Sequence, residues 1–252
     1  MRENAIHALL SWGLVAASVP TAIYLRLRPA PYGRHTTGGF GPELSARLGW
    51  VIMEVPALLR VPFVYAQGSS AREPLAMILL GCWLLHYAHR TLIFPLRLAP
   101  SSRRMPLLVA LAGFVFQVFN GALNARGMSE FNDFALGPAG WARVGLGAAL
   151  FFAGMAINLH ADTVLLRLRR DHPGAYSVPT GGLYRFVSCP NYLGELMEWA
   201  GFFLMAWNVP ALGFFCYSAA NLGARALSHH AWYREKFEDY PRERRALLPF
   251  VL

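Results

Sequence analysis

The chain has 252 residues, of which 55% are hydrophobic and only 15% are charged, and its mean hydropathy is +0.34. These values argue against a soluble domain, because the apolar residues also come in uninterrupted stretches of about 20 and not at amphipathic spacing. The formal net charge of +9 comes almost wholly from arginine, with Lys236 as the only lysine, and this skew favours a bacterial source with a GC-rich genome. The arginines lie in short segments between apolar stretches, where membrane topology explains them more simply than nucleic-acid binding does.

Seven apolar stretches predict an all-α integral membrane protein, and we expect residues 1–252 to form a single polytopic membrane domain. The stretches lie near residues 5–25, 48–66, 74–96, 106–124, 142–160, 192–208 and 209–227. Under this division, 17 arginine and lysine residues fall on one side of the membrane and four on the other. Cytoplasmic loops carry the positive excess, so we predict a seven-transmembrane-helix bundle with the N-terminus outside and the C-terminus in the cytoplasm. In a bacterium this membrane is the inner membrane, and in a eukaryote it is that of the endoplasmic reticulum.

Two of the expected spans supply most of the ionisable residues that lie inside spans, where such residues are costly and therefore need an explanation. The second span contains Glu54, and the third contains the run His86-Tyr87-Ala88-His89-Arg90-Thr91, in which Tyr87, Arg90 and Thr91 share one helical face. A carboxyl group in apolar surroundings can remain protonated at neutral pH and donate a hydrogen bond. Glu54 and the phenol of Tyr87 are therefore candidates for two donors that converge on one carbonyl oxygen and stabilise negative charge on it.

A simpler interpretation stays open for the same residues. Pairing with Arg90 or Arg60 would cancel the charge of Glu54 and give it a purely structural role. His86 and His89 are weaker candidates for chemistry, because a histidine inside a membrane span is more often a hydrogen-bonded packing residue.

Polar residues also recur at helical spacing near the cytoplasmic ends of three expected helices. They are Asn158, Asp162 and Arg169, then Asn191, Glu195 and Glu198, and finally Arg225, His229 and Tyr233. Each set alone is compatible with a solvated helix end, but three sets at one membrane face predict the wall of a polar site. Arginine suits phosphate, so a nucleotide-containing cofactor fits this wall. No G-x-G-x-x-G or P-loop pattern is present, so the cofactor would bind without a Rossmann unit.

At several points the sequence resembles the membrane steroid 5α-reductase family. The matching segments are His86-Tyr87-Ala88-His89-Arg90-Thr91, Gly181-Gly182-Leu183, Asn191-Tyr192-Leu193-Gly194-Glu195, Glu198-Trp199, His229-His230 and Phe237-Glu238-Asp239-Tyr240-Pro241. The resemblance runs from about Glu54 to Leu252 and implies a seven-helix membrane fold. It also implies NADPH-dependent reduction of the Δ4 double bond of a 3-oxo-Δ4 steroid, or a similar lipid enone, to the 5α-dihydro product.

The same resemblance implies a role for each candidate site residue. Glu54 and Tyr87 would be the catalytic pair that holds and polarises the substrate carbonyl. NADPH would contact Arg103, Asn158, Asp162, Arg169, Tyr176, Asn191, His229 and Tyr233. Ser177 stands where eukaryotic members often have an arginine, which bears on the choice between NADPH and NADH. The three cysteines have no zinc spacing, so no metal site is expected.

Two other hypotheses are compatible with parts of the sequence. The segment from Asn191 to Glu195 has similar forms in isoprenylcysteine methyltransferase-like enzymes, which use S-adenosylmethionine, although methyl transfer does not need a buried carboxyl–phenol pair. A small transporter or scaffold would predict inverted repeats, and the sequence shows none. We expect a monomer in contact with membrane lipid that takes a lipid or steroid substrate and binds no nucleic acid.

Overall fold

The computed structural model describes residues 2–28, 39–99, 104–172 and 174–252, and these are mostly helical. The long helices are α1 (Arg2–Leu27), α2 (Ala46–Tyr65), α3 (Pro74–Ala88), α5 (Leu107–Ser129), α6 (Pro138–Asp171), α7 (Pro190–Ala206) and α8 (Val209–Lys236). Each of the seven expected spans overlaps one of these helices, although α3 ends before the third expected span does and α6 extends beyond the fifth. The apolar runs therefore located the helices correctly.

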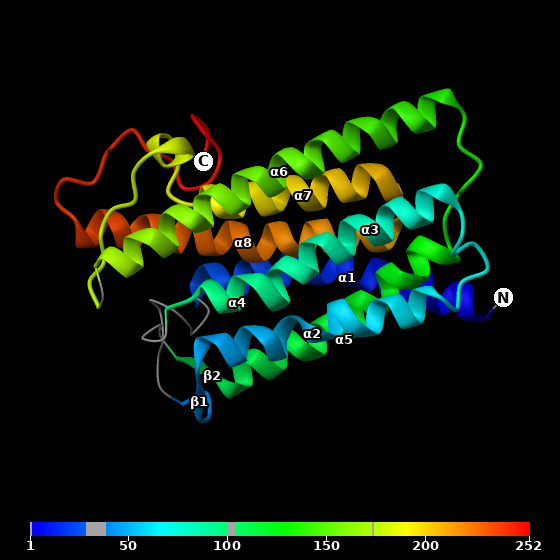
Figure 1. Ribbon diagram of the computed structural model, residues 1–252, viewed down its shortest axis with the longest axis horizontal. Helices are drawn as coiled ribbons and strands as arrows, with labels where there is room; N and C mark the ends of the chain where they lie inside the picture. The colour runs from blue at the N-terminus through cyan, green and yellow to red at the C-terminus, as the bar shows by residue number, and fades with distance from the viewer. Residues whose placement is uncertain (1, 29–38, 100–103, 173) are drawn as a thin grey trace.

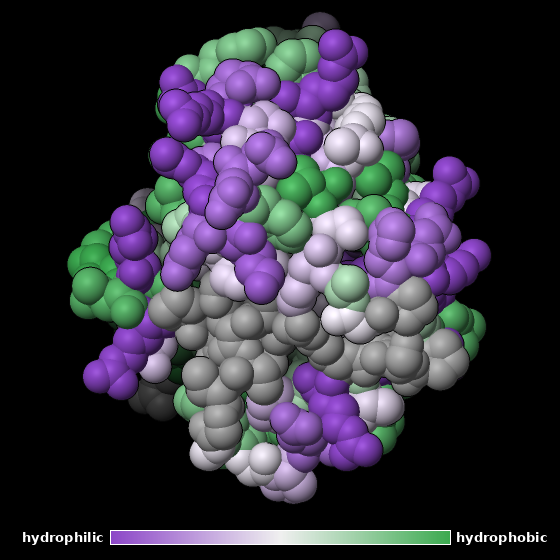
Figure 2. Space-filling model, turned by 90° about the vertical axis from the view of Figure 1, so that its left-hand side faces the viewer, coloured by the Kyte–Doolittle hydropathy of each residue, from purple (hydrophilic) through white to green (hydrophobic). Residues whose placement is uncertain are grey.

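The helices lie side by side along the longest axis of the molecule (Figure 1). α6 packs along α7, α1 along α8, and α2 along α5. Strand β1 (Glu43–Leu44) pairs antiparallel with β2 (Met105–Pro106), which ties the start of α2 to the start of α5. The C-terminal ends of α6 and α8 and residues 237–252 lie at this same end, which we call the basic end. Figure 2 looks onto it and shows hydrophilic side chains gathered across the face.

Within the described residues, five helical segments are long and apolar enough to cross a membrane: Glu3–Leu27, Ala46–Tyr65, Pro74–Arg97, Leu107–Ser129 and Pro138–Asp171. Their outward surfaces carry large apolar side chains, and those of Leu9, Val115 and Leu146 are 65–72% exposed. Amides such as Asn120 are instead buried between helices. Apolar residues outside and polar residues inside suit lipid as the surrounding solvent. At 17 residues α7 lies at the short limit for a span, so the count of seven crossings and the orientation stay predictions.

Glycines set the close approach of α6 and α7. A Cβ atom on Gly154 of α6 would lie 2.5 Å from the backbone oxygen of Gly194 and 2.6 Å from the backbone nitrogen of Glu198 on α7. A Cβ on Gly147 would lie 2.7 Å from the backbone oxygen of Gly201. Small residues let the backbones of membrane helices approach in this way. The contact brings the polar residues of α6 and α7 close together.

The third expected span contains a widened turn. After α3 the chain forms the π-helix η2 (His89–Ile93) and the short helix α4 (Phe94–Arg97). Pro95 explains the change, because it has no N–H for the carbonyl of Thr91 and its ring would clash with that carbonyl. The regular helical spacing expected for Arg90 and Thr91 is therefore not kept. Single π-helical turns occur frequently at functional sites.

The chain after α8 folds back onto the start of α7. Val187 forms a β-bridge with Arg245, and the Oγ of Ser188 lies 2.6 Å from Nδ1 of His230 and 2.7 Å from the hydroxyl of Tyr240. Burial raises the pKa of Tyr240, so its phenol stays neutral and keeps this hydrogen bond at physiological pH. These contacts fix the segment that leads into α7.

Candidate active site

Three side chains from different helices form a buried hydrogen-bonded group. Nε2 of Gln117, on α5, lies 2.8 Å from Oε2 of Glu54 on α2 and 3.1 Å from the hydroxyl oxygen of Tyr87 on α3. Their exposed fractions are 8% for Gln117, 7% for Glu54 and 2% for Tyr87. One amide nitrogen therefore reaches both oxygens. The structure brings together the two residues that the sequence predicts to act on one carbonyl.

The simpler interpretation of Glu54 predicts a direct pair with Arg90 or Arg60. In the described part of the chain, Glu54 forms no ion pair with Arg90 or Arg60. Arg60 instead donates from Nη1 to the backbone oxygen of Val118, 2.6 Å away. The neutral amide of Gln117 is the partner that the structure gives to this carboxyl group.

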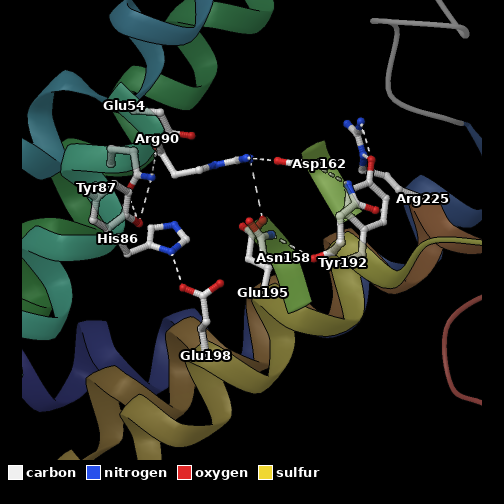
Figure 3. Close-up of polar contacts among 12 residues, drawn as sticks. Glu54, His86, Tyr87, Arg90, Asn158, Asp162, Tyr192, Glu195, Glu198 and Arg225 are labelled. Atoms are coloured by element: carbon white, nitrogen blue, oxygen red, sulfur yellow. Dashed lines mark hydrogen bonds and ion pairs between the residues drawn. The ribbon is translucent and has the colours of Figure 1, made fainter. Parts of the chain in front are cut away.

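Arg90 extends from η2 across the bundle to α6 and α7 (Figure 3). Its Nη1 lies 3.3 Å from Oδ2 of Asp162, and its Nη2 lies 3.7 Å from Oε2 of Glu195. The guanidinium carbon also lies 4.5 Å from the ring centroid of Trp50, a cation–π distance. Asp162 accepts a second hydrogen bond from Nδ2 of Asn191, at 3.2 Å. A buried cation is therefore held by two carboxylates and an aromatic face, and these contacts join η2, α2, α6 and α7 at the level of the site.

His86 and Glu198 form a second buried pair, with 2.8 Å between Nδ1 and Oε2. The His86 ring lies 5.0 Å from the ring of Tyr87 and 4.5 Å from that of Trp199, measured between centroids. His86 is thus hydrogen-bonded and packed against two aromatic rings, the arrangement that the sequence favours for it over a direct part in the chemistry. It supports one side of the Tyr87 ring.

A cavity of about 280 Å³ opens between Arg90 and the basic end of the bundle. Its wall includes five of the residues predicted to contact the cofactor: Asp162, Arg169, Tyr176, Asn191 and His229. These come from α6, the loop after it, α7 and α8. The fold therefore collects residues from three predicted polar stripes around one space.

The wall of the cavity suits an anionic ligand. Arg104 and Arg169 line it with exposed side chains, and among the described residues neither forms an ion pair. Nη2 of Arg225 donates to the hydroxyl of Tyr192 at 3.1 Å, and that hydroxyl lies 3.2 Å from Nε2 of His229. Guanidinium groups bind phosphate oxygens through paired hydrogen bonds. The donor set fits a phosphate-bearing dinucleotide.

Comparison with known proteins then decides the family. The family model for 3-oxo-5-alpha-steroid 4-dehydrogenase matches residues 103–252. The chain belongs to this family. It is 40% identical over 245 residues to steroid 5-alpha-reductase DET2 of Arabidopsis thaliana, with 94% of each chain covered. It is 38% identical over 258 residues to 3-oxo-5-alpha-steroid 4-dehydrogenase 1 of Bos taurus, which covers 100% of this chain and 99% of the relative.

A similar match extends to 3-oxo-5-alpha-steroid 4-dehydrogenase 2 of Homo sapiens, at 38% identity over 241 residues and 91% of each chain. As a member of the 3-oxo-5-alpha-steroid 4-dehydrogenase family, the protein is an oxidoreductase that acts on a CH–CH group and needs a redox cofactor. The resemblance found in the sequence is thereby confirmed. The methyltransferase and transporter hypotheses lose their support.

Three residues predicted to contact the cofactor are not part of the described cavity wall of this steroid dehydrogenase. Asn158 is buried and donates from Nδ2 to the backbone oxygen of Asn191 at 2.9 Å. Tyr233 stacks on Tyr240 with 5.3 Å between ring centroids. Arg103 lies outside the described residues. Their contacts with a cofactor stay predictions.

Gln117 is the main site residue that the sequence did not predict. An amide inside an apolar span is a signal of the same kind as Glu54, because it too is costly to bury without a partner. Its partners come from α2 and α3, however, and spacing along α5 cannot reveal them. The ion pairs of Arg90 with Asp162 and Glu195 cannot be predicted from the sequence either, because these partners also lie on other helices.

Proposed function

We propose that the protein catalyses the NADPH-dependent reduction of the Δ4 double bond of a 3-oxo-Δ4 steroid, or a similar lipid enone, to the 5α-dihydro product. The observation that carries this proposal is that Glu54 and Tyr87 both accept a hydrogen bond from Nε2 of Gln117 inside an apolar bundle. The names of the relatives, steroid 5-alpha-reductase and 3-oxo-5-alpha-steroid 4-dehydrogenase, support the substrate class.

Glu54 and Tyr87 are the proposed catalytic residues. Both donate hydrogen bonds to the enone oxygen, which draws electrons from the conjugated double bond and stabilises the enolate. Each donor of this kind is worth about 2.7–4 kcal/mol in acyl-transfer enzymes. When bound, the reduced nicotinamide supplies the hydride that the β-carbon receives. A proton from solvent completes the reduction at the α-carbon, so the product carries two more hydrogen atoms than the substrate.

The cavity is the proposed site of NADPH. Arg169 supplies an exposed positive charge for phosphate. Asp162 and Asn191 are hydrogen-bonded to each other and form the polar part of the cavity wall next to Arg90. Tyr176 and His229 lie on the other walls of the same cavity. In this proposal NADPH binds without a Rossmann unit.

We also propose that residues 1–252 form one domain that crosses the bacterial inner membrane seven times and functions as a monomer. With the basic end in the cytoplasm, the cavity faces the compartment that holds soluble dinucleotides. The steroid would then reach Glu54 and Tyr87 from the lipid. The excess of arginine at this end supports the orientation.

The proposal is tested by anaerobic incubation of the purified protein in detergent with progesterone, a 3-oxo-Δ4 steroid, and either NADPH or NADH. We expect loss of the Δ4 bond to form the 5α product, at a higher kcat/KM with NADPH. Chromatography and mass spectrometry identify the product and its stereochemistry. A panel of 3-oxo-Δ4 steroids that gives no cofactor-dependent product would overturn the proposal.

A further inference from the structure

We propose that Gln117 is a positioning residue that directs the protons of both Glu54 and Tyr87 toward the substrate carbonyl, an inference that rests on the proposed enone reduction. Gln117 does not contact the reacting carbons in this proposal. Its role is to set which atoms of the catalytic pair donate.

The geometry matches the two hydrogens of a primary amide to two oxygen acceptors. The nitrogen of Gln117 carries two N–H donors, and it lies 2.8 Å from Oε2 of Glu54 and 3.1 Å from the hydroxyl oxygen of Tyr87. The amide oxygen is 3.4 Å from the Tyr87 hydroxyl, which is beyond the usual range for a strong O–H···O bond. Gln117 is therefore mainly a donor to this pair.

This assignment determines where the remaining protons lie. Because Oε2 of Glu54 accepts from Gln117, a neutral carboxyl group carries its proton on the other oxygen. Because the Tyr87 oxygen also accepts an N–H, its own O–H is polarised and available to a third group. A carbonyl oxygen that enters between them then meets two donors. If the amide oxygen stood in the place of the nitrogen, it would accept both protons itself.

The helix contact around Gln117 holds the amide in place. Gly113 and Gly121 stand one helical turn before and after it on α5. A Cβ on Gly121 would lie 2.8 Å from Cγ2 of Val61 on α2, and a Cβ on Gly113 would collide with the side chain of Met53. These glycines let α2 approach α5 at the level of Gln117, and Glu54 follows Met53 directly. Helix packing thus fixes the distance on which the inference depends.

Asn124 offers a matched control on the same helix. It is a buried amide, and its Nδ2 bonds to Asn120 of the same helix, at 3.1 Å to the backbone oxygen and 2.9 Å to Oδ1. Among the described residues it has no bond to Glu54 or Tyr87. Asn124→Ala therefore removes a buried amide from α5 without touching the catalytic pair.

The experiment compares wild type, Gln117→Met, Gln117→Glu and Asn124→Ala, each in detergent with progesterone and NADPH. A missing direct donor costs about 100- to 1000-fold in kcat, so we expect Gln117→Met, which acts through the pair, to lose about ten- to hundredfold. The KM for NADPH should stay within about twofold, because the cavity is unchanged. Gln117→Glu keeps the shape but loses both N–H donors, so its loss should be at least as large. Asn124→Ala should keep the wild-type kcat.

A binding measurement separates the donor role from packing. Infrared difference spectra of bound steroid, isotope-labelled at the carbonyl carbon, report how strongly the oxygen is polarised. The carbonyl band should lie at lower frequency in wild type than in Gln117→Met. The effect of Gln117→Met on kcat should also be smaller in a Tyr87→Phe background than in wild type, because one of the two hydroxyl groups that Gln117 orients is then absent.

The inference is overturned if Gln117→Met retains wild-type kcat and carbonyl frequency, or if Asn124→Ala loses as much activity as Gln117→Met. Wild-type turnover is measured first and distinguishes the two proposals. If wild type reduces no 3-oxo-Δ4 steroid, the proposed function itself is wrong. If wild type is active and the Gln117 variants are equally active, only the role of Gln117 is wrong.

Discussion

Glu54 and Tyr87 are tolerated in an apolar bundle because each has a hydrogen-bond partner in Gln117. A buried polar group that loses its partner costs about 1–3 kcal/mol. In the proposed reaction the substrate carbonyl approaches the Tyr87 hydroxyl and the other carboxyl oxygen of Glu54. Hydrogen bonds hold the site together, and hydrogen bonds are also what the site would offer to the substrate. This favours a preorganised arrangement.

Substitutions at Tyr87 and Glu54 test the carbonyl-binding role at the residue scale. Tyr87→Phe removes the phenol hydroxyl and should lower kcat by at least about 100-fold, the scale for one missing oxyanion donor. Glu54→Gln keeps a donor and should lose less activity than Glu54→Ala. The double substitution should be less than additive, since both groups act on one oxygen. Steady-state kinetics and cofactor titration measure these effects, and near-normal turnover of Tyr87→Phe would refute the role.

Arg169 tests the cofactor cavity at the same scale. Arg169→Ala removes an exposed guanidinium from the wall and should raise the KM for NADPH by about tenfold, or roughly 1.4 kcal/mol, with little change in the KM for steroid. Arg170→Ala is the control, because Arg170 is the next residue, carries the same charge and does not line the described cavity. Equal effects of the two substitutions would show that Arg169 contributes only to the general positive charge of this end.

At the scale of elements, the contact between α6 and α7 places the polar residues of both helices. Gly154 and Gly194 permit a backbone approach that no larger residue allows. Asn158, one turn after Gly154, then reaches the backbone of Asn191 at the start of α7. The cavity wall depends on this contact because Asn191 in turn holds Asp162.

Gly154→Ala should therefore destabilise the protein, by about 1–3 kcal/mol if the helices must shift to accept the methyl group. Gly145→Ala on the same helix is the control, since nothing lies within 4 Å of a Cβ built there. Alanine is a better helix former than glycine by about 1 kcal/mol, so this variant should be as stable as wild type or more so. Thermal unfolding in detergent, followed by circular dichroism, compares them. An unchanged Tm for Gly154→Ala would mean that the contact is looser than described.

At the scale of the whole molecule, charged and apolar surfaces lie at different positions along the length of the bundle. Apolar side chains cover the sides of the helices, and hydrophilic ones gather at the basic end (Figure 2). The predicted orientation follows from this asymmetry, because positive residues are retained in the cytoplasm.

Reporter fusions test this orientation. A reporter after Leu252 should be cytoplasmic, and one inserted in the loop at residues 67–73 should be external, since Figure 1 shows the two positions at opposite ends of the bundle. Phosphatase and fluorescent-protein fusions give opposite signals on the two sides and control for expression. Two fusions that report the same side would show that the number of crossings between them is wrong.

The sequence by itself determined the positions of the helices, the membrane character, the family and the identity of Glu54 and Tyr87 as candidates. Each depends on local information. A run of about 20 apolar residues is long enough to span a bilayer wherever it lies, and a carboxyl group within such a run is costly whatever its neighbours are. These properties can be read along one chain without knowing how the helices pack.

Only the tertiary structure decided which polar groups are partners. Gln117 bridges Glu54 and Tyr87, while Arg90 pairs with Asp162 and Glu195 and not with Glu54. These contacts depend on the rotation and spacing of neighbouring helices. The rotation and spacing are set by close contacts at glycines and by the π-helical turn before Pro95. The physical reason is that periodicity fixes which face a residue occupies on its own helix, whereas its partner depends on side-chain packing between helices that are far apart in sequence.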